Sequence, residues 1–285
     1  MGRTIFEIEG AMMKSKKQEA ASNIAVFDAG IGSYAVVELL REYYPKQNIL
    51  YFADRAHFPY GGKSKEELRQ IMKTTIEYLL QYEPKAIIVA SNAPSVLVLD
   101  EVKEDYDIPI YGIKPPIKKA VEVSKSGHIA VLGAKALVES ERIQHYIDEE
   151  KGESQAKINT IDASDVIKLV ESGDFINYPA EVKQHVKEFV ADIVEQDPEV
   201  DTFTLSSTHL PWVQPYLTIL YPQYQFLDPA RHIMENLKPV VTKGKGRVKA
   251  LVTTCEDYTL ENFEDTLSKL NLKMEVEEVE MDCGE

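Results

Sequence analysis

Two serines, Ser91 and Ser207, each follow a short run that is predicted to be a β-strand. A serine hydroxyl is a weak acid, and it becomes a base or a nucleophile only when a neighbouring group takes its proton. His209, two residues after Ser207, and Asp28, at the end of the first predicted strand, are the candidates for that group. These four residues are therefore the candidates for catalysis. The alternative is that both hydroxyls belong to ordinary turns or caps at helix N-termini.

Further polar residues near these turns are candidates for holding a small acid. Helix N-termini after Gly32, Asn92 and Thr208 would direct backbone N–H groups at a carboxylate, without the need for an arginine. The turn at residues 59–62 is predicted to close over the bound molecule, and its alternative is an ordinary surface loop. The candidate substrate-binding residues are Tyr60, Gly61, Asn92 and Thr208.

From Asn23 onward the chain alternates β-rich runs with amphipathic stretches, which is typical of an α/β protein. One helix should start at a capping box formed by Ser64 and Glu67, and an earlier one should pack with Val36, Val37, Leu40 and Tyr43 on one side. Strands joined by crossover helices pair in parallel and bind ligands at their carboxyl ends. We expect strands over residues 24–27, 48–52, 86–90, 108–112, 128–132, 157–161, 201–205, 223–227, 247–253 and 273–278.

The starts of the predicted strands form two series with similar spacing. They are separated by 24, 38 and 22 residues in the first series and by 29, 44 and 22 in the second. The simplest explanation is two similar parallel-sheet α/β domains that face each other across a cleft. The alternative is that the similar spacing of the two series is accidental, because α/β units repeat every ~25–45 residues in any case.

Composition argues against several classes of partner. The 285 residues carry a formal net charge of −15, which argues against a nucleic acid or an anionic membrane surface. The apolar runs fall far short of the ~20 residues that span a bilayer, and residues 1–22, expected to be a flexible extension, have no secretory signal pattern. Cys255 and Cys283 lack zinc-ligand neighbours and cannot build a disulfide framework, so we expect no metal and a reducing, cytoplasmic compartment.

Five segments of the chain resemble the cofactor-independent aspartate/glutamate racemase family in order and spacing. The resemblance extends from residue 23 to about residue 240, and it implies that no cofactor is used and that the ligand is a small amino acid or dicarboxylate. It also implies a homo-oligomer, expected to be a dimer. The implied domains are 23–114 with about 228–285, and 115–227. The five segments are residues 26–32, 51–54, 58–61, 89–92 and 207–209.

The resemblance implies that two thiols, one from each domain, flank the substrate α-carbon, where this chain has Ser91 and Ser207. Ala29 and Ala93 also stand where the family is expected to have hydroxyls, which suggests a changed ligand. The working hypothesis is proton transfer at the α-carbon of a small amino or carboxylic acid. Two alternatives remain: a catalytically silent homologue that binds a small acid, and a hydrolase or lyase in which His209 activates Ser207.

A dinucleotide site is a further alternative. Gly30, Gly32 and Ala35 satisfy the looser G-x-G-x-x-A pattern after a predicted strand, and Asp54 lies near the distance expected for a ribose contact. Against this hypothesis, Asp28 places a carboxylate directly before the glycines, close to where a pyrophosphate would sit.

Overall fold

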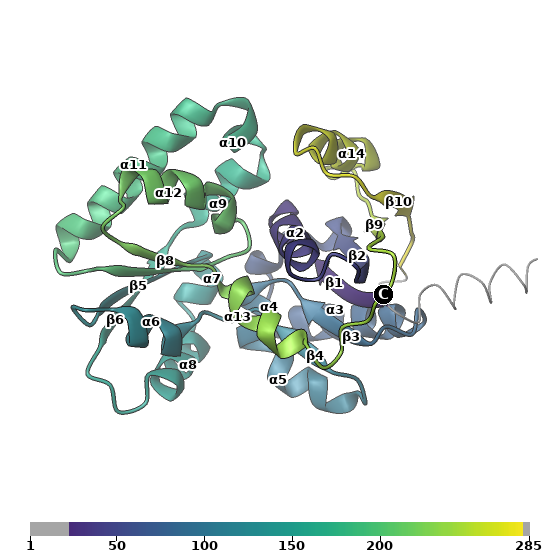
Figure 1. Cartoon of the computed structure of the whole chain (residues 1–285), viewed down its shortest axis with the longest axis horizontal. Coiled ribbons are helices and arrows are strands. Elements are labelled where there is room, and N and C mark those ends of the chain that lie inside the picture. The colour runs from purple at the N-terminus through teal and green to yellow at the C-terminus, as the bar shows by residue number, and fades with distance from the viewer. Residues whose placement is uncertain (1–22, 282–285) are drawn as a thin grey trace, which may run out of the picture.

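The computed structural model describes residues 23–281, so the expected extension at 1–22 lies outside the described residues. Two lobes, each built around its own sheet, lie side by side (Figure 1). The six-stranded sheet has the order β10-β9-β2-β1-β3-β4 and the four-stranded sheet the order β6-β5-β7-β8, with every pair parallel. The first sheet consists of β1 (Asn23–Asp28), β2 (Asn48–Asp54), β3 (Ala86–Val89), β4 (Ile110–Gly112), β9 (Val248–Thr253) and β10 (Glu275–Glu278), and the second of β5 (His128–Gly133), β6 (Lys157–Asp162), β7 (Thr202–Ser206) and β8 (Gln225–Leu227).

The strand order repeats between the two sheets. The series β2-β1-β3-β4 in the first sheet corresponds to β6-β5-β7-β8 in the second, so the expected pair of similar α/β domains is confirmed. In each series the second strand pairs with one edge of the first strand and the third strand with its other edge. The strand order therefore reverses between β1 and β3 and between β5 and β7. Open parallel sheets bind ligands at such switch points, outside the carboxyl ends of the strands.

Helices cover the faces of both sheets. The capping box of α3 is present, with the Ser64 hydroxyl accepting from the Glu67 N–H and the Glu67 carboxylate accepting from the Ser64 N–H. On α2, Tyr43 departs from expectation: it is 39% exposed while the rest of the expected face is buried. The helices are α2 (Tyr34–Tyr43), α3 (Lys65–Leu80), α4 (Asn92–Leu97), α5 (Leu99–Val102), α6 (Ile117–Val123), α7 (Lys135–Val138), α8 (Glu141–Lys151), α9 (Ser164–Glu171), α10 (Asp174–Asn177), α11 (Pro179–Gln196), α12 (Gln214–Leu220), α13 (Pro229–Met234) and α14 (Leu260–Lys269).

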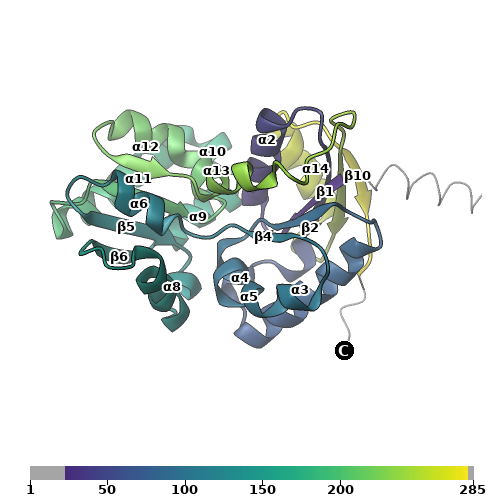
Figure 2. The same cartoon turned by 60° about the horizontal axis from the view of Figure 1, so that its bottom comes forward.

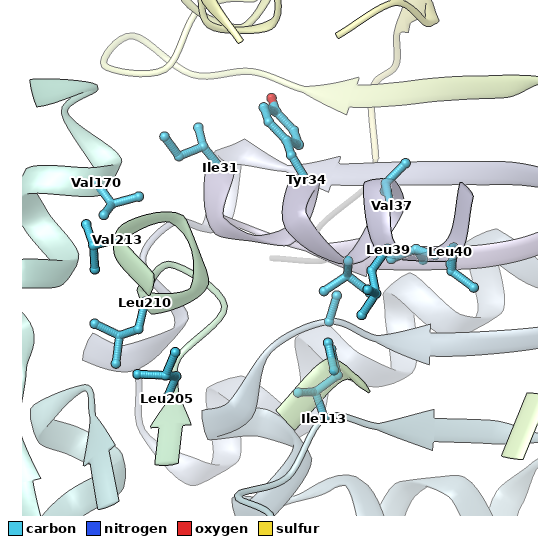
Figure 3. Close-up of a cluster of buried hydrophobic side chains, with 14 of the residues drawn as sticks. Ile31, Tyr34, Val37, Leu39, Leu40, Ile113, Val170, Leu205, Leu210 and Val213 are labelled. Atoms are coloured by element: carbon cyan, nitrogen blue, oxygen red, sulfur yellow. The ribbon is translucent and has the colours of Figure 1, made fainter. Parts of the chain in front are cut away.

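Apolar side chains from both lobes form one continuous cluster. Ile31 belongs to the 3₁₀ turn η1 (Ile31–Ser33) of the first lobe, whereas Val170 lies on α9 and Val213 on the turn η5 (Leu210–Val213) of the second. Figure 3 shows Ile31 facing Val170 and Val213 across the junction. Because burying such groups removes apolar area from water, this contact favours closed lobes and fixes the turns that end β1 and β7 close together.

The chain passes between the lobes twice, between β4 and α6 and again near α13 (Figure 2). We propose domain boundaries near residues 114 and 228, in keeping with the expectation from the resemblance, because the strands divide between the two sheets at these points. Within residues 23–281, no helix combines the length and the apolar character that crossing a membrane requires.

Candidate active site

A cavity of about 530 Å³, counted with its opening, lies between the lobes at the two switch points. The ends of β1 and β3 border it on one side and the turn after β7 on the other. The structure thus brings together residues separated by up to 181 positions in the chain, and all eight candidate residues line the cavity. They are Asp28, Tyr60, Gly61, Ser91, Asn92, Ser207, Thr208 and His209.

On the β7 side, Ser207 begins a line of hydrogen bonds that leads away from the cavity. Its Oγ lies 3.3 Å from Nδ1 of His209, and the imidazole Nε2 lies 2.7 Å from a carboxylate oxygen of Glu171. All three side chains are buried or nearly so. The Ser207 Oγ also accepts a long bond, 3.4 Å, from the His209 N–H. The spacing between hydroxyl and imidazole, close to the ~3.2 Å expected of a nucleophile and its base, favours chemistry over capping.

Glu171, at the end of α9, was not among the predicted residues. Besides His209, its carboxylate accepts hydrogen bonds from the Ile31 N–H at 3.0 Å and from the Arg55 guanidinium at 2.8 Å. Burial opposes the ionised form, but the bonds and charges of His209 and Arg55 hold the pKa of Glu171 below its ordinary value. The carboxylate is therefore ionised at neutral pH and can orient the imidazole.

Arg55, in the turn η2 (Arg55–His57), was missed as well. Its guanidinium lies over the rings of Phe58 and Tyr258 and donates to the carbonyl of Ala29 in addition to Glu171. Burial disfavours the cation, yet Glu171 raises the pKa of Arg55 above its ordinary value. No sequence motif marks the pair, because 116 residues separate its members and only the packing of α9 against the first lobe brings them into contact.

On the β1 side, Ser91 pairs with Asp28 rather than with an imidazole. Burial raises the pKa of Asp28 to about 7, against the lowering influence of His209, of the Ala29 N–H and of the hydrogen bond from Ser91. Thr208 spans the cavity by donating its hydroxyl to Asp28 at 3.3 Å. Ser91 is the N-cap residue of α4, but its side chain makes no capping bond. Each serine hydroxyl thus contacts a titratable group.

Asn92 lies beside Ser91 with both amide atoms buried and without a hydrogen-bond partner within the described residues. The residue is only 3% exposed and lines the cavity. A buried amide without partners costs about 1–3 kcal/mol, so such a group in a cavity is typical of a site that a polar ligand completes.

Two of the predicted contacts take a different form. The Tyr60 ring lines the cavity, but its hydroxyl donates to the fully buried Asp54 at 2.7 Å and is not directed at a ligand. The segment after Thr208 is the 3₁₀ turn η5 rather than an α-helix. After Gly32 the chain enters helix α2 through the turn η1, whose first residue, Ile31, donates its N–H to Glu171. The turn after Thr208 therefore does not provide the α-helix N-terminus that the sequence predicts.

The glycines of the first turn have a structural explanation. A Cβ built on Gly32 would lie 2.6 Å from Nδ1 of His209 and 2.7 Å from its backbone N, and one on Gly30 would lie 2.8 Å from the same ring. Glycine is needed so that the turn after β7 can approach. Asp54, the expected ribose contact, is enclosed by Tyr60, His57 and Thr253. The dinucleotide hypothesis is wrong on both counts.

Comparison with protein-family models finds no match. Comparison with individual proteins, in contrast, finds clear relatives. The glutamate racemase of Persephonella marina is 30% identical over 264 residues, which cover 92% of this chain and 99% of the relative. The chain belongs to the aspartate/glutamate racemase family. The glutamate racemase of Chlorobaculum tepidum is 34% identical over 224 residues, covering 78% of this chain and 80% of the relative.

Solved structures of the aspartate/glutamate racemase family share the fold. The crystal structure of glutamate racemase isoform RacE1 from Bacillus anthracis matches with a TM-score of 0.79 at 25% identity, over 91% of this chain and 98% of that one. The glutamate racemase of Thermus thermophilus, in complex with β-chloro-D-alanine, matches with a TM-score of 0.74 at 25% identity, over 92% and 98%. These relatives place the chain among isomerases of the amino-acid racemase type.

Proposed function

We propose that the protein exchanges the α-proton of a small amino acid, without a cofactor, in the cavity between its lobes. The observation that supports this proposal is the pairing of each serine on the cavity wall with a titratable partner. The Ser91 hydroxyl acts on Asp28, whose pKa it lowers, and the Ser207 Oγ lies 3.3 Å from Nδ1 of His209. The two pairs come from different domains, as two acid–base groups acting on opposite faces of one carbon would need to.

A hydroxyl can relay a proton where it cannot hold a stable negative charge. Ser91 would take the α-proton while passing its own to the Asp28 carboxylate, and Ser207 would deliver a proton from the His209 imidazolium to the other face. In the opposite direction of turnover the roles exchange. A carboxyl group with a pKa of about 7 suits both tasks at neutral pH, because its two protonation states are similarly populated.

Asn92 is the proposed binding group. Its amide can donate from Nδ2 to the substrate carboxylate and accept at Oδ1 from the ammonium, which would supply the partners that both atoms lack. Tyr60 and Gly61 would form the wall beside the ligand, and Thr208 would hold Asp28 in place. Cytoplasmic location and a homodimer remain predictions.

Incubation in D₂O tests this function. L- and D-glutamate come first, because the relatives are glutamate racemases, and L- and D-aspartate second. We expect loss of the α-proton signal in the NMR spectrum and appearance of the opposite enantiomer. The matched control is Ser206→Ala, since this neighbouring hydroxyl bonds Thr204 rather than a base and its loss should leave exchange in place. Absence of exchange for all four amino acids at high protein concentration would contradict the proposal for these substrates.

A further inference from the structure

Ser207, His209 and Glu171 form a hydrogen-bonded line, of which the proposed proton exchange uses only Ser207 and His209. Glu171 is ionised and accepts from Ile31 and Arg55, so it can only accept from the imidazole. The proton of neutral His209 therefore resides on Nε2, and Nδ1 presents its lone pair to the Ser207 hydroxyl 3.3 Å away. A hydroxyl, a base facing it and a carboxylate that fixes the tautomer of the base are the three parts of an activated serine nucleophile.

The cavity also offers a donor for an oxyanion. Asn92, from the opposite domain, is buried with its Nδ2 unpartnered, and it lines the same space as Ser207. A carbonyl group bound between the two residues would direct its oxygen at this amide. In enzymes that use an asparagine side chain in this way, the donor is worth about 10²–10³ in rate.

The lining of the cavity also suits an uncharged carboxyl derivative. Among the described residues that border it there is no lysine or arginine, whereas Asp28 contributes a carboxyl group. Parts of the cavity wall consist of short side chains, those of Ala29, Ala93 and Ala134. The space therefore suits a short acyl group. An ester or an amide presents the electrophilic carbonyl without a second negative charge to be desolvated.

We propose that Ser207 is a nucleophile that accepts the acyl group of a small amino or carboxylic acid from its ester or amide. The Ser207 oxygen would bond to the carbonyl carbon while its proton moves to Nδ1 of His209. The bond from that carbon to the alcohol or amine would then break, and the leaving group would take the proton from Nδ1. Water would repeat the sequence on the acyl-serine, releasing the free acid and restoring the hydroxyl.

This activity shares its cavity with the proposed function but not its reaction, so each can fail alone. The experiment uses the full chain, with phenylmethanesulfonyl fluoride as a small serine-directed probe and p-nitrophenyl acetate as a short ester. We expect the sulfonyl adduct on Ser207, located by peptide mass spectrometry, and a burst of p-nitrophenol that matches the protein concentration. Ser207→Ala should lose both, whereas Ser206→Ala should keep both.

The variant Glu171→Gln tests whether Glu171 orients His209 as the base for Ser207 or whether His209 is only adjacent to the serine. An amide can donate to Nε2 and stabilise the wrong tautomer, so labelling should slow by about 10²-fold or more and its pH profile should change. If Ser207 remains unlabelled while the amino-acid α-proton exchanges, the nucleophilic role of Ser207 is refuted and the proposed function stands. Labelling without exchange would instead contradict the proposed function for the four amino acids tested. An equal burst from Ser207→Ala would also overturn the nucleophile.

Discussion

The two sides of the cavity carry the same hydroxyl at equivalent places and couple it to different bases. Ser91 follows β3 and Ser207 follows β7, the third strands of the repeated series. On one side the base is a carboxyl at the end of β1, Asp28. The second domain has Gly133 at the end of β5, the corresponding strand, and its base is instead His209, from the same turn as the serine.

This difference shows which features of the site come from the repeated fold and which come from individual residues. The repeat sets the positions of the two hydroxyls, because the strand order around each switch point is the same. The electrostatics differ because the two series carry different charged residues around these strands. His209 is connected to the buried pair of Glu171 and Arg55, whereas Asp28 is buried without a cation bonded to it and has a raised pKa for that reason.

The largest expected effect tests whether the two sides act on opposite faces of the substrate. Ser91→Ala and Ser207→Ala should each slow racemisation by about 10²–10⁴-fold, because one proton relay is removed. Each variant should retain deuterium exchange with one enantiomer only, and the retained enantiomer should differ between the two. NMR in D₂O, started separately from each pure enantiomer, measures this. If both variants retain the same enantiomer, the serines do not face opposite sides.

The next effect concerns the ion pair that exists on the β7 side alone. Glu171→Ala leaves the Arg55 charge buried without its partner, which should lower the free energy of unfolding by about 3–5 kcal/mol in a denaturant titration. The matched control is the double variant Arg55→Met with Glu171→Gln, which removes both charges and keeps an acceptor for Ile31. It should recover more than half of the loss. A loss below ~1 kcal/mol in Glu171→Ala would show that the pair contributes little to closing the lobes.

Sequence reasoning found one part of this arrangement and missed another for a physical reason. Strands and turns follow from local patterns, and the family resemblance marks the turns that hold the eight lining residues, so Asp28, Ser91 and His209 could be named from short segments. Glu171 and Arg55 are ordinary charged residues whose role depends on α9 packing against the first lobe. Tyr60 was also named from its turn, and the sequence does not show that its hydroxyl donates to the buried Asp54. Local patterns do not reveal which partner a buried polar group finds.

A smaller effect comes from the base on the β1 side. Because the pKa of Asp28 is raised to about 7, the folded chain holds a proton that the unfolded chain releases above pH ~4. Asp28 therefore lowers stability progressively as the pH rises from about 4 to 7, and the full cost is present above pH 7. Asp28→Asn should increase the free energy of unfolding by about 1–4 kcal/mol at pH 8 and by little at pH 4, while exchange activity falls. An equal effect at both pH values would contradict the raised pKa.

The smallest expected effect is a gain, and it asks whether the two hydroxyls still occupy the places of acid–base groups. A thiol has a pKa near 8.5 and forms a useful thiolate fraction beside His209, whereas a hydroxyl does not. Ser91→Cys combined with Ser207→Cys should raise the rate of α-proton exchange by about tenfold or more, and each single change should give less, because racemisation needs a proton carrier on both faces. Ser206→Cys is the matched control, since that position has no base next to it. A double variant no faster than the unaltered chain would mean that the backbone around β3 and β7 no longer directs these side chains at a common carbon, and the symmetry of the two sides would then be a property of the fold alone.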